Sequence, residues 1–93
     1  MQTKELYAGM IEKMGIKHQV AVCIEELSEL QKTLTKVLRD KGNSMHVCEE
    51  IADVLICVGQ MQQHFDQTGD SVKLFRRFKL ERLQKFYLEG RET

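Results

Sequence analysis

Residues 24–30, IEELSEL, and residues 48–54, CEEIADV, decide the fold that we expect of this 93-residue chain. Within each stretch an acid is followed three residues later by another acid: Glu26 by Glu29, and Glu50 by Asp53. Residues three apart lie on the same face of a helix, so each pair would share one face. Apolar residues border both pairs at the three- and four-residue spacing of a helix that packs in a bundle.

The same apolar spacing predicts four helices, no sheet and one domain over residues 1–93. The expected helices are 3–14, 17–39, 45–66 and about 70–88, with Asn43 or Ser44 capping the third and Asp70 or Ser71 the fourth. Short connections favour antiparallel neighbours, so the second and third helices should form a hairpin with their inner faces together. We therefore expect an all-α, four-helix bundle in which the apolar side chains of the fourth helix point inward, namely Val72, Phe75, Phe78, Leu83 and Phe86.

The composition limits the classes of function that the chain can have. Fourteen Lys and Arg balance fourteen Asp and Glu, which argues against a protein that mainly coats nucleic acid or an anionic membrane. No apolar run approaches the roughly 20 residues that cross a bilayer, and the first ten residues lack the apolar core of a secretory signal. We expect a cytoplasmic protein whose three cysteines, Cys23, Cys48 and Cys57, are reduced and buried.

The predicted hairpin would bring the two acid pairs into one pocket. Four carboxylates between two helices repel one another and lose hydration unless protons or cations compensate. Oxygen ligands from Asp and Glu suit Mg²⁺, or Mn²⁺ as an alternative, and Mg²⁺ commonly also binds the phosphate oxygens of a substrate. The sequence therefore predicts a divalent-metal site made by Glu26, Glu29, Glu50 and Asp53.

Over roughly residues 16–89, the chain resembles the MazG-like all-α nucleoside triphosphate pyrophosphohydrolases, which carry an E-x-x-E motif on one helix and E-x-x-D on the next. Here these motifs are residues 26–29 and 50–53. The resemblance implies Mg²⁺-dependent hydrolysis of a nucleoside triphosphate between the α and β phosphates, giving the monophosphate and pyrophosphate. It also implies a homodimer or homotetramer, in agreement with the marginal core of so short a chain. It does not choose among canonical, deoxy and damaged nucleotides.

Further residues are candidates for supporting roles in that reaction. Glu25 is a candidate for the base that deprotonates the attacking water. Lys79 and Arg82, three apart beside the aromatic residues of the fourth helix, are candidates for phosphate contacts, with Lys32 and Lys36 as alternatives. Gln19, about two turns before Glu26, is a candidate for contact with the nucleobase, a role that the resemblance implies. We expect surface or capping roles for the three histidines, which lack metal-ligand spacing: His18, His46 and His64.

Two other classes of protein fit parts of the pattern. A ferritin-like di-iron protein also places acids inside a helical bundle, but its Glu-x-x-His signature does not occur in this chain. A non-catalytic helical interaction module would use the apolar stripes for a partner. Such a module predicts no metal dependence and tolerance of Glu50→Gln.

Overall fold

The computed structural model describes residues 1–92, with the side chains of residues 1–90. This part of the chain forms four helices and no strand: α1 (Thr3–Met14), α2 (Ile16–Leu38), α3 (Ser44–Phe65) and α4 (Asp70–Glu92). The all-α prediction and the number of helices are confirmed. The predicted bounds of α1, α2 and α3 agree with the structure to within one residue, whereas α4 continues to Glu92 instead of ending near Leu88.

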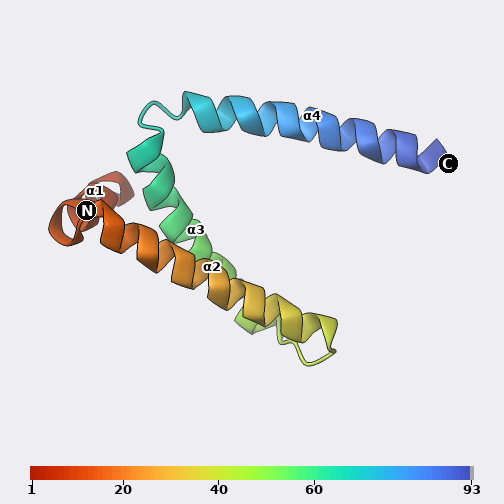
Figure 1. Ribbon diagram of the computed structural model, residues 1–93, viewed down its shortest axis with the longest axis horizontal. Helices are drawn as coiled ribbons and strands as arrows, with labels where there is room; N and C mark the ends of the chain where they lie inside the picture. Colours follow the sequence, from red (N-terminus) through yellow and green to blue (C-terminus); the bar gives the residue numbers. More distant parts are fainter. Residues whose placement is uncertain (93) are drawn as a thin grey trace.

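The helices α2 and α3 form the predicted antiparallel hairpin, and α1 packs across the open end of this hairpin (Figure 1). The hairpin buries few side chains. Within the described residues its buried apolar side chains are Cys23 and Cys57, and Gln19, Thr33 and Gln60 are the buried polar ones. The amide Nε2 of Gln19 donates to Oε1 of Gln60 at 2.7 Å, so the buried polar groups of the two helices satisfy each other.

Local sequence explains where the helices begin and end. Gly15 has a φ of 90°, a conformation that favours glycine, and it separates α1 from α2 as the sequence predicts. Oδ1 of Asn43 accepts from the backbone amides of Met45 and His46, so Asn43 is the cap of α3. Gly59 permits the close approach of α1 to α3, because a Cβ there would lie 3.0 Å from the ring of Tyr7.

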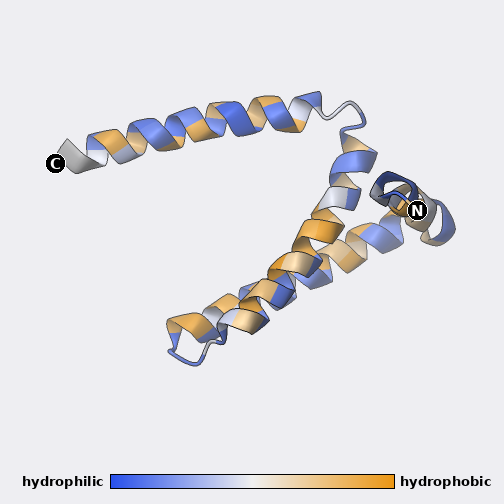
Figure 2. Cartoon of the chain, turned by 180° about the vertical axis from the view of Figure 1, so that it is seen from behind, coloured by the Kyte–Doolittle hydropathy of each residue, from blue (hydrophilic) through white to orange (hydrophobic). Residues whose placement is uncertain are grey.

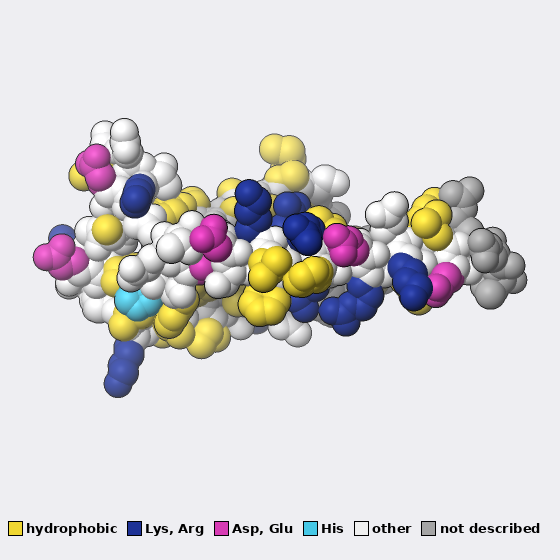
Figure 3. Space-filling view, turned by 90° about the horizontal axis from the view of Figure 1, so that it is seen from above, with side chains coloured by type: hydrophobic (Ala, Val, Ile, Leu, Met, Phe, Trp, Pro, Cys, Tyr) yellow, Lys and Arg dark blue, Asp and Glu magenta, His cyan; other side chains and the backbone are white. Residues whose placement is uncertain are grey.

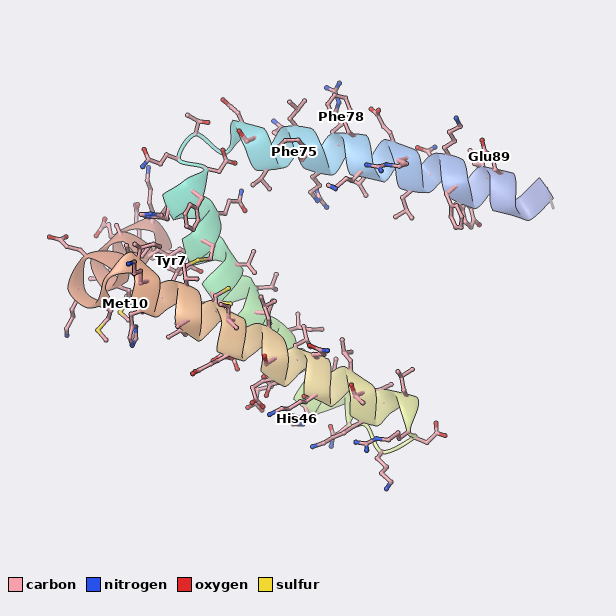
Figure 4. The ribbon with its side chains drawn as sticks, in the orientation of Figure 1. Tyr7, Met10, His46, Phe75, Phe78 and Glu89 are labelled. Carbon is pink, nitrogen blue, oxygen red and sulfur yellow. The ribbon has the colours of Figure 1, made fainter. Side chains whose placement is uncertain are left out.

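The helix α4 extends away from the other three and makes no extensive contact with them in the described part of the chain (Figure 1). Phe75 and Phe78 lie on this projecting helix with no other helix beside them (Figure 4). The prediction that the apolar side chains of α4 point into a bundle is therefore wrong for the single chain. Nine of them are exposed: Val72, Leu74, Phe75, Phe78, Leu80, Leu83, Phe86, Tyr87 and Leu88.

The turn between α3 and α4 holds α4 in its outward direction. The two carboxylate oxygens of Asp66 accept from the backbone amides of Ser71 at 3.2 Å and Val72 at 2.9 Å. The amide of Asp66 itself donates to the carbonyl of Gln62 and so completes the end of α3. Asp66, together with Thr68, whose Oγ1 accepts from the amide of Asp70, therefore provides the side-chain acceptors for the first turn of α4 in place of the predicted Asp70 or Ser71.

Apolar surface remains open on the hairpin as well as on α4. Hydrophobic stretches run along α3 and alternate with hydrophilic ones along α4 (Figure 2). In the view from above, hydrophobic side chains lie at the surface beside Lys and Arg side chains (Figure 3). Burial of a large apolar side chain stabilises a fold by about 1.5–3 kcal/mol, so this exposure leaves much of the available stabilisation unused. Over residues 1–92, none of the helices combines the length and the hydropathy that crossing a membrane requires.

Replacement of Asp66 by alanine tests the role of this turn. The Asp66→Ala variant should lower the free energy of unfolding by about 1 kcal/mol, because two backbone amides of α4 lose their acceptor. Denaturant unfolding followed by circular dichroism measures the change. Gln67→Ala, an exposed neighbour in the same turn, is the matched control and should leave the unfolding midpoint unchanged.

Candidate metal site

Three of the four predicted metal ligands meet between α2 and α3. Carboxylate oxygens of Glu26 from α2 and of Glu50 and Asp53 from α3 all lie within 4.8 Å of one another. Glu26 is partly buried and the side chain of Glu50 is only 12% exposed, whereas Asp53 is exposed. The three acids therefore form a cluster that begins between the helices and opens to solvent on one side. We call Glu26, Glu50 and Asp53 the acid cluster.

The fourth predicted ligand, Glu29, lies at the edge of the acid cluster. Its side chain is 54% exposed, and its Oε1 lies 3.5 Å from Nζ of Lys32. Glu29 is not among the three residues whose oxygens converge, although its charge contributes to the electrostatic environment of Glu26. Glu25, the candidate base, is exposed on α2.

The acid cluster is electrostatically strained without a cation. Burial raises the pKa of Glu26 above its usual value of 4.5, and the neighbouring carboxylates of Asp53, Glu50, Glu29 and Glu25 raise it further. Both causes act against the charged form of Glu26. A bound divalent cation would reverse both effects, since it would neutralise the neighbours and replace the lost water with a ligand bond.

One residue beside the acid cluster was not among the candidates from the sequence. Nε2 of His46 lies 3.3 Å from Oε1 of Glu50, and both residues belong to α3. A protonated imidazole would form an ion pair with Glu50, and a neutral one with its proton on Nε2 would donate a hydrogen bond to it. In either form the contact with His46 orients the carboxylate of Glu50. The four-residue spacing between His46 and Glu50 was the sequence signal for this contact.

The structure separates the other predicted substrate residues from one another. Gln19 is 4% exposed and hydrogen bonded to Gln60 and His18, so its side chain already has partners inside the hairpin. Lys79 and Arg82 lie on α4, which projects away from the hairpin, and the single chain does not bring them to the acid cluster. Lys32 alone of these candidates lies beside the predicted ligands, through its contact with Glu29.

The cysteines do not offer a competing site. Cys23 and Cys57 are buried, as predicted, but Cys48 is exposed, so the prediction of a buried thiol there is wrong. Burial and a hydrogen bond with Cys23 raise the pKa of the Cys57 thiol to about 12. A thiol with that pKa is protonated at neutral pH and is therefore a poor nucleophile.

The exposed side chains give the hairpin two different faces. With 100° between successive residues of a helix, seven of the exposed apolar residues of α2 and α3 fall on one face, whereas the exposed Met45 and Ile56 fall on the side of Glu49. This apolar face consists of Ile24, Leu27, Leu34, Leu38, Ile51, Leu55 and Val58. The acid cluster opens on the opposite, polar face, which carries Glu25, Glu29, Lys32, Lys36, His46, Glu49 and Asp53. The acid cluster therefore opens away from the apolar face.

Comparison of the chain with protein-family models, with curated proteins and with solved structures found no match. The interpretation of the site therefore depends on the residues themselves.

The raised pKa of Glu26 predicts how stability depends on pH without a metal. Between the unfolded value near 4.5 and the raised folded value, the folded state binds more protons than the unfolded state. The free energy of unfolding should therefore fall as the pH rises through this interval. Thermal unfolding in EDTA should show this fall for the wild type, and Glu26→Gln should remove it and unfold at a higher temperature at pH 7.

Added Mg²⁺ should raise the unfolding temperature of the wild type, because a ligand that binds only the folded state stabilises it. It should not stabilise Glu26→Gln to the same extent. Glu12→Gln, which removes an exposed acid of α1, should behave as the wild type does. An identical response of the wild type and Glu26→Gln to Mg²⁺ would contradict metal binding by the acid cluster.

Proposed function

We propose that the chain is a MazG-like pyrophosphohydrolase that cleaves a nucleoside triphosphate between its α and β phosphates. The convergence of Glu26, Glu50 and Asp53 from two helices within 4.8 Å is the observation that carries this proposal. The E-x-x-E and E-x-x-D motifs of the sequence supply these acids. The products would be the nucleoside monophosphate and pyrophosphate, and the proposed place of the reaction is the cytoplasm.

The donor set of the acid cluster fits a hard divalent cation such as Mg²⁺ or Mn²⁺. Its members are carboxylate oxygens, which these ions prefer, and the raised pKa of Glu26 shows the crowding of negative charge that such an ion relieves. A bound Mg²⁺ supplies charge neutralisation of the phosphates and activation of a water molecule. In this proposal Glu26, Glu50 and Asp53 hold the ion, and Glu29 joins them when its contact with Lys32 opens.

The chain's own residues have distinct tasks in this scheme. His46 orients Glu50, since its imidazole contacts one of the carboxylate oxygens. Glu25 is exposed next to Glu26, so it has access to solvent, and we propose it as the base that takes a proton from the attacking water. No covalent intermediate on the protein is needed, in agreement with the protonated state of Cys57.

We further propose that the protein works as a homodimer or homotetramer. The described side chains of a single chain leave the apolar face of the hairpin and nine apolar side chains of α4 exposed. Most of the stability of a helix in a protein comes from packing of its apolar face, so a partner surface would stabilise α4. A second copy of the chain provides apolar surface of the same kind.

The same exposure favours a second candidate function, a non-catalytic helical interaction module. Its specific support is α4, whose exposed aromatic residues have no role in the acid cluster. This candidate does not explain why three acids converge at the boundary of the core, where like charges cost stability. We therefore prefer the pyrophosphohydrolase.

The reaction can be tested with a panel of ribo- and deoxynucleoside triphosphates, with and without Mg²⁺. The wild type should release pyrophosphate and the monophosphate only with the metal. Glu50→Gln should lower kcat/KM by more than about 100-fold, because it removes a buried ligand and the partner of His46. The adjacent Glu49→Gln, on the exposed side of α3, is the matched control and should retain activity. Full activity of Glu50→Gln, or turnover of no nucleotide at all, would favour the interaction module.

The oligomer can be tested by mass measurement in solution. The wild type should have a mass of two or four chains of 10.8 kDa. Phe86→Ser should shift this mass toward the monomer, because it removes an aromatic side chain that is 72% exposed in the single chain. Gln84→Ser, on the same helix, should not. A wild type that is entirely monomeric would contradict the proposed assembly.

A further inference from the structure

A hollow of about 340 Å³ adjoins the acid cluster on the polar face of the hairpin. It lies between the second half of α2 and the first turn of α3. The residues that line it are Glu29, Lys32, Thr33, Thr35, Lys36, Arg39 and His46. The hollow is linked to the acid cluster through His46, which lines the hollow and also contacts Glu50 at 3.3 Å.

The lining is rich in groups that bind anions. Lys32, Lys36 and Arg39 carry positive charges, and His46 adds an imidazole, whereas Glu29 is the one acid among the lining residues. Lys32 is paired with Glu29. Among the described side chains, neither Lys36 nor Arg39 has a carboxylate within 4.0 Å. Two cations thus remain available to an incoming ligand.

A structural role at the end of α2 does not account for Lys36 and Arg39. Cations near the last turn of a helix commonly bond its free carbonyls. Here the carbonyl of Lys36 already accepts from the amides of Arg39 and Lys41, and the carbonyl of Val37 accepts from Asp40. The backbone therefore satisfies these two carbonyls without the side chains of Lys36 and Arg39.

We propose that Lys36 and Arg39, together with Lys32 and His46, bind the terminal phosphates of the substrate. This inference rests on the proposed function and gives the substrate a direction. The scissile phosphate lies at the acid cluster, and the β and γ phosphates extend toward the loop of residues 39–43. The nucleoside is then directed toward the end of the hairpin that α1 covers. The ligand class of the hollow is a polyphosphate of at least two phosphate groups.

Charge and placement support this direction. The acid cluster is negative and repels phosphates unless a metal ion lies between them, whereas the hollow beside it is positive. Phosphate oxygens form strong charge-assisted hydrogen bonds with Lys and Arg. The hollow is the place on the hairpin where cations from α2 and His46 from α3 line one cavity beside the acids. The alternative cations, Lys79 and Arg82, lie on the projecting α4.

The experiment measures the binding of tripolyphosphate by calorimetry with excess Mg²⁺, so that no hydrolysis of a nucleotide is needed. Lys36→Gln/Arg39→Gln should weaken tripolyphosphate binding by about tenfold or more, because two charge-assisted contacts are lost. Lys13→Gln/Lys17→Gln, which removes the same charge at the opposite end of the hairpin, should stay within about twofold of the wild type on additivity of distant sites. Circular dichroism confirms that each variant keeps its helices.

Chemical shifts of the backbone amides locate the ligand independently of any variant. Tripolyphosphate should shift the amides of residues 32–46, and adenosine monophosphate should shift them much less. Four results would each overturn the inference. Two concern the variants: equally weakened tripolyphosphate binding in Lys36→Gln/Arg39→Gln and Lys13→Gln/Lys17→Gln, or loss of binding in Lys79→Gln/Arg82→Gln alone. The other two concern the wild type: chemical-shift changes confined to α4, or no binding of tripolyphosphate. Failure of nucleotide hydrolysis with intact binding in the hollow would refute the proposed function and leave the binding site standing. Full kcat/KM in Lys36→Gln/Arg39→Gln would refute the binding of the terminal phosphates in the hollow and would leave the proposed function intact.

Discussion

The repulsion among Glu26, Glu50 and Asp53 is the constraint on which the interpretation of the molecule depends. Packing of α2 against α3 brings these carboxylates together, and burial, followed by the charges of the neighbouring carboxylates, raises the pKa of Glu26. The buried hydrogen bond between Gln19 and Gln60 fixes the two helices against each other nearer the end that α1 covers. A hairpin that gained nothing from the cluster would be more stable with neutral residues there. A divalent cation held by the three acids would offset this cost.

Much of this part of the molecule could be predicted from the sequence. The apolar spacing gave the hairpin, and the three-residue spacing placed Glu50 and Asp53 on one face toward Glu26. The prediction was less accurate for Glu29, whose side chain contacts Lys32 instead. Spacing specifies the face of a helix on which a residue lies. It does not specify the rotamer that a long, exposed side chain adopts, or which of two nearby charges it contacts.

The direction of α4 could not be predicted in this way. The periodicity of Phe75, Phe78 and Phe86 shows that these side chains favour burial, but it does not identify the chain against which they pack. The side-chain bonds of Asp66 to Ser71 and Val72 set the path of the turn, and they depend on a local geometry that single-residue preferences do not reveal. For the same reason the sequence could not show that Lys79 and Arg82 lie apart from the acids of their own chain.

The two faces of the hairpin reconcile a small core with a functional site. If a second copy covered the polar face, it would bury the acid cluster and exclude a phosphate substrate. The residues of the apolar face, including Leu27, Leu34 and Leu55, lie on the opposite side. Association through that face and through α4, as proposed, would add hydrophobic burial to a short chain, and it would leave the acid cluster and the cationic hollow open. In the proposed assembly, burial of apolar surface and access to the acids would therefore use different sides of one hairpin, because the apolar face and the acid cluster lie on different sides of α2 and α3.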